Sequence, residues 1–144
     1  MAPLTQKRLW LFGLIIFLVP LGAFTKYYDG LAAHWVNNHF GDILYEIFWC
    51  LVGALCFSQT SSTKIITIVF ITTCSLEILQ LWQPTFLTTI RSTFIGHAII
   101  GSSFDLWDFP YYALGCLIAL IWLNRINKIQ EAPDRRTKQH PNHP

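Results

Sequence analysis

Four long apolar stretches, separated by short polar segments, constrain the fold of this 144-residue chain more than any other feature. They cover residues 9–24, 41–57, 65–82 and 106–123. A transmembrane helix needs about 20 predominantly apolar residues, so each stretch is at the short end of the length required for a span. The sequence therefore predicts an all-α membrane protein, a bundle of four transmembrane helices within residues 1–123.

The composition excludes most other classes of protein. Apolar residues make up 53% of the chain and charged residues only 12%, against roughly 25% charged residues in a soluble domain. So few charged side chains cannot cover the surface of a water-soluble globule. The same figures exclude an intrinsically disordered chain, and a net charge of only +2 argues against a nucleic-acid partner.

The first apolar stretch also has features of a secretory signal peptide, because Lys7 and Arg8 precede it. No clear small-x-small cleavage site stands before Thr25, and three further apolar stretches follow. We therefore interpret residues 9–24 as an uncleaved first span.

The basic residues predict the orientation of the bundle. In a four-span chain, both termini and the loop at residues 58–64 lie on the same side of the membrane. That side holds eight of the ten basic residues, namely Lys7, Arg8, Lys64, Arg125, Lys128, Arg135, Arg136 and Lys138. The positive-inside rule then predicts a multi-pass protein with both termini in the cytoplasm, and residues 124–144 as a polar, basic cytoplasmic tail that is disordered and solvated.

Residues 86–101 are apolar but lack the pattern of a span. One stripe, repeated every four residues, consists of Phe86, Ile90, Phe94 and Ala98, and the opposite stripe consists of Thr89, Thr93 and His97. This pattern is typical of an amphipathic helix in the membrane interface, here on the outer side. A re-entrant hairpin between the third and fourth spans is the alternative.

The charged residues near the membrane gather in its predicted outer half. A charge in the middle of a membrane costs about 2.5–3.5 kcal/mol on insertion scales, so its retention calls for an explanation. Asp42 and Glu46 are four residues apart and share one helix face, and Glu77 is expected at a depth similar to that of Glu46. The candidate ligand-binding residues of an outward-facing polar pocket are Asp42, Glu46, Glu77, Gln80, Arg91, Asp108 and Tyr112.

Two simpler interpretations of these residues stay open. Asp42, Asp105 and Asp108 could mark helix N-termini, where a carboxylate is favourable. Glu77 and Arg91 could form a purely structural ion pair, since Arg91 is the one fixed cation close enough in sequence to neutralise the acidic group.

Other chemistries have little support in the sequence, so neither a cofactor nor a metal site is expected. The four cysteines, Cys50, Cys56, Cys74 and Cys116, lie inside predicted spans without CxxC spacing and are interpreted as small apolar core residues. An interfacial metal site that consists of His34, His39, Asp42 and Glu46 is the weaker alternative. No hydrolase, metalloprotease or phosphate-loop motif is present.

Several short motifs resemble those of the uncharacterised VanZ-like family of small bacterial polytopic membrane proteins. They consist of Gly41-Asp42, Glu77-x-x-Gln80, Arg91, Trp107-Asp108 and Gly115, and the resemblance covers roughly residues 41–123. It implies a protein of the bacterial plasma membrane, in which Gly115 serves helix packing. Tyr112 stands where VanZ proteins usually have Asn, so the resemblance does not imply glycopeptide resistance.

The function predicted from these features is the binding of a lipid-linked or amphiphilic envelope ligand. Arg91 would contact an anionic headgroup, and the carboxylates would line the pocket. The alternatives are a non-catalytic membrane assembly factor, a lipid-modifying enzyme with Glu77 or Asp108 as general base, and a small proton-coupled transporter. The expected partners are membrane lipids, and a homodimer is required by the transporter hypothesis.

Overall fold

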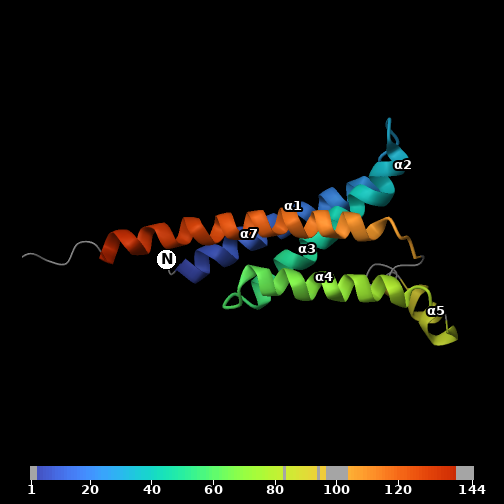
Figure 1. The fold of residues 1–144 in the computed structure, drawn as a ribbon. Helices are drawn as coiled ribbons and strands as arrows, with labels where there is room; N and C mark the ends of the chain where they lie inside the picture. Colours follow the sequence, from blue (N-terminus) through green and yellow to red (C-terminus); the bar gives the residue numbers. More distant parts are fainter. Residues whose placement is uncertain (1–2, 83, 94, 97–103, 139–144) are drawn as a thin grey trace, which may run out of the picture.

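The computed structural model describes residues 3–82, 84–93, 95–96 and 104–138, and the regular structure in this part of the chain is helical (Figure 1). The helices are α1 (Pro3–Thr25), α2 (Ala33–Trp35), the π-helix η1 (Val36–Phe40), α3 (Gly41–Cys56), α4 (Ser62–Leu79), α5 (Thr85–Arg91) and α7 (Asp108–Lys138). The prediction of an all-helical protein is confirmed at this level.

Four long helices, α1, α3, α4 and α7, run between the two ends of the molecule. Figure 1 shows the N-terminus, the connection from α3 to α4 and the far part of α7 at one end. The segment after α1, helix α5 and the start of α7 lie at the other end, which we call the α5 end. Asp42, Glu77 and Asp108, three of the predicted outer carboxylates, belong to the parts of α3, α4 and α7 at this α5 end.

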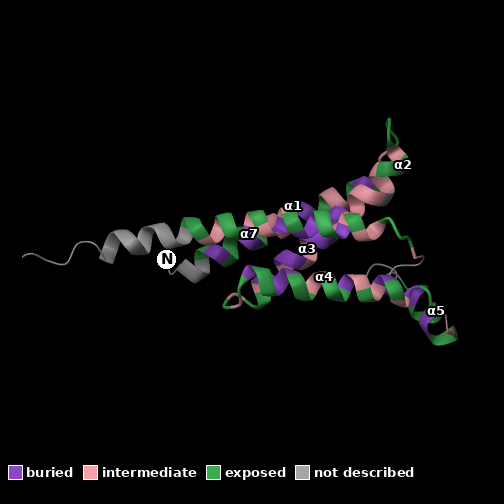
Figure 2. Ribbon diagram, in the orientation of Figure 1, coloured by how far each residue is buried: buried purple, intermediate pink, exposed green. Residues whose placement is uncertain are grey.

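Helix α3 is the centre of the bundle, since it contacts α1, α4 and α7. Its buried apolar residues join those of the other three helices in one core that consists of Leu11, Leu18, Ile43, Leu44, Ile47, Cys50, Leu51, Ala54, Ile65, Ile66, Cys116, Ala119 and Leu123. Figure 2 shows buried residues where α3 meets its neighbours and exposed residues along the outer sides of α1, α4 and α7. Large apolar side chains such as Phe17, Ile71 and Leu117 are exposed on these outer sides, as expected of helices that face lipid.

Three helices in the described part of the chain are long and apolar enough to cross a membrane. They are Gln6–Thr25 in α1, Ser62–Leu79 in α4 and Asp108–Ile129 in α7. The predicted second span, residues 41–57, coincides with α3, which has 16 residues. It is therefore shorter than the other three, although α2 and η1 precede it without a break in the helix.

Helix α5 coincides with the first part of the predicted interfacial helix. Helix α5 ends at Arg91, and the hydroxyl groups of Ser92 and Thr93 donate hydrogen bonds to the carbonyl oxygens of Thr89 and Ile90. Side chains that bond to nearby carbonyls in this way compete with helix propagation. Of the other residues of the predicted stripes, Phe94, His97 and Ala98 lie outside the described residues.

Helix α7 continues well beyond the predicted end of the fourth span. It runs to Lys138, through a segment for which the sequence predicts a disordered tail. Once a helix has formed, each added residue contributes one further hydrogen bond, and Arg, Lys, Gln, Glu and Ala are good helix formers.

Candidate functional site

The polar residues of α3 and α7 form two facing rows at a spacing of four residues. On α3 the row consists of Asp42, Glu46 and Cys50, and on α7 it consists of Asp108, Tyr112 and Cys116. Residues four apart lie on the same helix face, about 6 Å apart along the axis. The bundle therefore stacks its polar side chains in layers from the α5 end towards the middle.

Gly115 allows the two rows to approach closely. A Cβ atom at this position would lie 2.8 Å from the carbonyl oxygen of Ile43 and 2.8 Å from Cβ of Glu46. Any side chain other than hydrogen would therefore push α7 away from α3. The close contact of the two helices at Gly115 brings Glu46 and Cys116 within hydrogen-bonding distance.

The outermost layer consists of His39, Asp42 and Asp108. One ligand atom from each of these half-buried side chains lies within 4.8 Å of the other two, so the group could hold a cation. The π-helical turn of η1 places His39 beside Asp42, and the imidazole stacks on the ring of Tyr111 with centroids 4.5 Å apart. Single π-helical turns often occur at functional sites, which supports a role for this layer.

The second layer surrounds Glu77, whose side chain is 1% exposed. Its Oε2 accepts hydrogen bonds from Gln80 Nε2 at 2.8 Å and from the Tyr112 hydroxyl at 3.1 Å. Its Oε1 accepts a bond from the backbone N–H of Asp105 at 2.9 Å. Both carboxylate oxygens are thus bonded, and the network ties α4 to the start of α7.

Arg91 also lies at this end of α4, but it bonds to backbone carbonyl oxygens. Its Nη2 donates to the carbonyl of Leu79 at 3.0 Å and its Nη1 to that of Trp82 at 3.5 Å. These carbonyls belong to the end of α4 or follow it, where a cation is favourable because helix carbonyls there lack helical partners. Among the described residues, the guanidinium forms no ion pair with Glu77, in contrast to the structural pair left open by the sequence.

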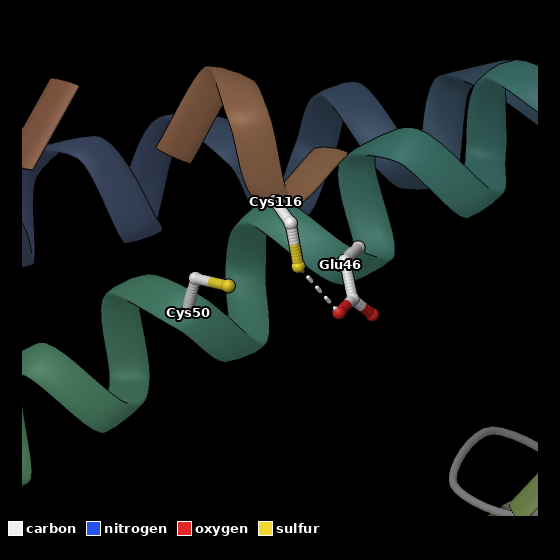
Figure 3. A group of neighbouring side chains, drawn as sticks. All are labelled: Glu46, Cys50 and Cys116. Carbon is white, nitrogen blue, oxygen red and sulfur yellow. Dashed lines mark hydrogen bonds between the residues drawn. The ribbon is translucent and has the colours of Figure 1, made fainter. Parts of the chain in front are cut away.

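The third layer lies deeper and contains Glu46, Cys50 and Cys116. Glu46 is fully buried, and its Oε1 accepts a hydrogen bond from the Cys116 thiol at 3.1 Å (Figure 3). Thr73 Oγ1 lies 3.2 Å from the same oxygen, but it also lies 3.1 Å from the carbonyl oxygens of Val69 and Phe70. One hydroxyl proton serves three acceptors, and Glu46 Oε2 has no hydrogen-bond partner among the described residues.

The expectation of equal depth for Glu46 and Glu77 is wrong. Glu46 meets Thr73, four residues before Glu77 on α4, and meets Cys116, four residues after Tyr112 on α7. Both offsets equal one helical turn, so Glu46 lies about 6 Å deeper. The sequence spacing places residues along each helix but leaves the axial offset between helices undetermined.

The structure thus divides the seven candidate residues among four places. Asp42 and Asp108 lie together with His39, and Glu77, Gln80 and Tyr112 form one network. Arg91 caps the end of α4, and Glu46 belongs to the deeper layer. Sequence reasoning missed Cys50 and Cys116 as members of the rows, although each follows Asp42 or Asp108 by eight residues and thus continues the same helix face.

A groove of about 710 Å³ lies elsewhere, along the first half of α1. It is lined by Gln6, Leu9, Trp10, Gly13 and Leu14. None of these residues belongs to the polar layers, and the exposed aromatic and aliphatic lining suits the acyl chains around a membrane protein. We therefore place the candidate site in the layers and not in this groove.

Comparison with protein families gives one match. A family described as a protein of unknown function, DUF2809, matches residues 31–116, more than half of the chain. The chain belongs to the DUF2809 family. No curated protein and no solved structure matches.

The DUF2809 segment contains all three layers. It begins just before α2 and ends at Cys116, so it includes both rows of α3 and α7 and the whole of α4. Helix α1 and the part of α7 after Cys116 lie outside it. Within the described part of this segment, α4 is long and apolar enough to cross a membrane, and the description of the family assigns no activity to these residues.

Proposed function

We propose that this DUF2809 protein is a four-span membrane protein in which α3 crosses the membrane in addition to α1, α4 and α7. The support is its position, because α3 fills the centre of the bundle and the run from α2 to α3 is helical over residues 33–56. A helix of this length rises about 36 Å, enough for a hydrocarbon core of about 30 Å. The positive-inside rule then assigns both termini to the cytoplasm, and the VanZ-like motifs suggest a bacterial plasma membrane.

At the outer, α5 end, this protein binds the polar head of an amphiphilic or lipid-linked envelope ligand. The observation that carries the proposal is the half-buried cluster of His39, Asp42 and Asp108, which lies at the end of an apolar bundle. Exposed aromatic side chains surround this end, among them Trp35, Trp82 and Trp107. Such residues favour the interface between headgroups and acyl chains, where a ligand of this kind is found.

Each polar residue has a distinct part in this proposal. Asp42 and Asp108 accept hydrogen bonds from hydroxyl or amino groups of the ligand. Arg91 holds an anionic group. Within the described residues, its Nε is buried without a hydrogen-bond partner, and its Nη1 and Nη2 donate to backbone carbonyls. The hydrogen-bond network of Glu77 with Gln80 and Tyr112 positions α4 against α7. The apolar part of the ligand lies along the exposed outer sides of these two helices.

The test compares bound lipids in matched variants. The protein is extracted mildly, and native mass spectrometry records which lipids stay bound to wild type, to the double variant Asp42→Asn/Asp108→Asn and to Arg91→Ala. We expect one lipid species to be enriched on the wild type and lost from both variants. Asp29→Asn, in the loop after α1, is the control and should retain the lipid.

Equal lipid retention in all four proteins would contradict the proposal. Because Arg91 also caps α4, its variant is interpreted only alongside a melting curve. The double Asp variant keeps the shape of both side chains and removes their charge, so it separates recognition from folding.

A further inference from the structure

The deeper layer around Glu46 has features that hydrogen bonding within the fold does not explain. Glu46 is fully buried in the middle of the bundle, and in the part of the chain that the structure describes one of its carboxylate oxygens has no hydrogen-bond partner. An ionised group in such a place is costly unless a cation or a full set of donors compensates it. The other oxygen receives one thiol bond and a share of one hydroxyl proton.

The side chains beside this carboxylate are of types that can ligate a metal ion. The sulfur atoms of Cys50 and Cys116 and one carboxylate oxygen of Glu46 lie within 4.8 Å of one another. Figure 3 shows the Cys116 sulfur directed at the carboxylate and the Cys50 sulfur facing the same space. Both cysteines are buried and free of disulfide bonds.

We propose that Glu46, Cys50 and Cys116 form a binding site for a thiophilic divalent cation of the zinc and cadmium class. Ligands of a tetrahedral zinc ion lie ~3.5–3.8 Å apart, given Zn–S and Zn–O distances of about 2.3 and 2.0–2.2 Å. The observed separations need only side-chain rotation and small shifts to reach these values. Two sulfur ligands out of three select a soft cation over Mg²⁺ or Ca²⁺.

The charges of the site also favour a divalent cation. Binding releases the two thiol protons to solvent, and the cation then faces two thiolates and one carboxylate. Thr73 acts as a positioning residue, since its hydroxyl bonds to the carboxylate oxygen that Cys116 also contacts. The row on α3 continues outward from Cys50 through Glu46 to Asp42, which places oxygen ligands between the α5 end and the thiols.

Cadmium titration of the full-length protein in lipid nanodiscs under reducing conditions tests this site. We expect an ultraviolet thiolate-to-cadmium charge-transfer band that saturates at one ion per chain. The double variant Cys50→Ser/Cys116→Ser should lack the band. Its matched control, Cys56→Ser/Cys74→Ser, removes the two cysteines outside the site and should retain it.

Two single variants measure how much Glu46 and Thr73 contribute to cadmium binding. Glu46→Gln removes an anionic ligand and should weaken cadmium binding by more than the ~10–100-fold that is typical of an outer-shell partner. Thr73→Val should weaken it about 10-fold, within that same range.

X-ray absorption of cadmium bound to the Cys56→Ser/Cys74→Ser protein keeps the proposal testable if the Cys50 variant does not fold. Two sulfur neighbours around the ion would support the site. The proposal is overturned by absence of sulfur neighbours, by absence of the charge-transfer band in wild type, or by a band that survives in Cys50→Ser/Cys116→Ser. Lipid retention at the α5 end is a separate measurement, so either proposal can fail alone.

Discussion

Glu46 and Glu77 are both buried carboxylates in the same apolar bundle, one helical turn apart, yet their surroundings differ. Glu77 accepts hydrogen bonds on both oxygens from three donors that belong to three different residues. Glu46 Oε1 accepts a hydrogen bond from the Cys116 thiol and shares the Thr73 hydroxyl proton with backbone carbonyl oxygens. Its Oε2 has no hydrogen-bond partner among the described residues.

This difference separates a group that holds the fold together from one that is open to a ligand. A buried polar group with all its hydrogen bonds adds to stability and to the precision of packing. A buried carboxylate with an incomplete set of hydrogen bonds lowers the stability of the fold. Its presence therefore indicates a role other than stabilising the fold. We therefore propose that Glu77 stabilises the fold and that Glu46 binds a ligand.

The largest expected effect comes from replacing each glutamate by leucine, which is similar in size. Glu77→Leu leaves the donors of Gln80, Tyr112 and Asp105 without an acceptor, at about 1–3 kcal/mol for each buried group. We expect it to lower the free energy of unfolding by about 3–5 kcal/mol, measured by circular dichroism in mixed detergent micelles. Glu46→Leu, measured without metal, should change it by at most about 1 kcal/mol, because a well-packed apolar residue replaces an incompletely bonded carboxylate.

An equal loss of unfolding free energy in Glu46→Leu and Glu77→Leu would refute the proposed difference between the two glutamates. A larger loss for Glu46→Leu than for Glu77→Leu would reverse the assignment.

The next effect concerns the contact between α3 and α7 that positions Glu46. Gly115→Ala would place a methyl group 2.8 Å from the carbonyl oxygen of Ile43 and from Cβ of Glu46. Overpacking of this kind typically costs about 1–3 kcal/mol, and it should also weaken cadmium binding by separating Cys116 from Glu46.

Gly22→Ala is the control for this substitution, because nothing lies within 4 Å of a Cβ atom at Gly22 in α1. Alanine is a better helix former than glycine, so this variant should be neutral or up to about 1 kcal/mol more stable. Identical melting curves for Gly115→Ala and Gly22→Ala would show that the helices do not touch at Gly115.

The smallest effect is expected from removing one hydroxyl donor, either that of Tyr112 beside Glu77 or that of Thr73 beside Glu46. Tyr112→Phe removes the hydrogen bond that the Tyr112 hydroxyl donates to Glu77. It should lower the free energy of unfolding by about 1 kcal/mol. Thr73→Val removes a hydroxyl that three acceptors share, and should cost less than Tyr112→Phe. The measurement is the difference in unfolding free energy between the two variants, and the opposite order would contradict the proposed completeness of the Glu77 network.

Much of the helical architecture could be predicted from the sequence, because the length of an apolar stretch and the scarcity of charge suffice to indicate a membrane helix. The spacing of Asp42 and Glu46, and of Asp108 and Tyr112, also predicted which residues share a face. The end of α5 and the extension of α7 could not be predicted, since each depends on local hydrogen bonds and helix propagation that hydropathy does not report.

By itself, then, the sequence determined the helical class of this DUF2809 protein, the approximate bounds of its four long helices and the polar residues that each contributes. Only the tertiary structure decided that Glu46 meets Thr73 and Cys116, and that Arg91 bonds to carbonyl oxygens at the end of α4. The physical reason is that periodicity orients residues within one helix, but the rotation and axial offset between helices follow from close packing. In this bundle the close contact between α3 and α7 depends on the lack of a side chain at Gly115, where a Cβ atom would lie 2.8 Å from the carbonyl oxygen of Ile43.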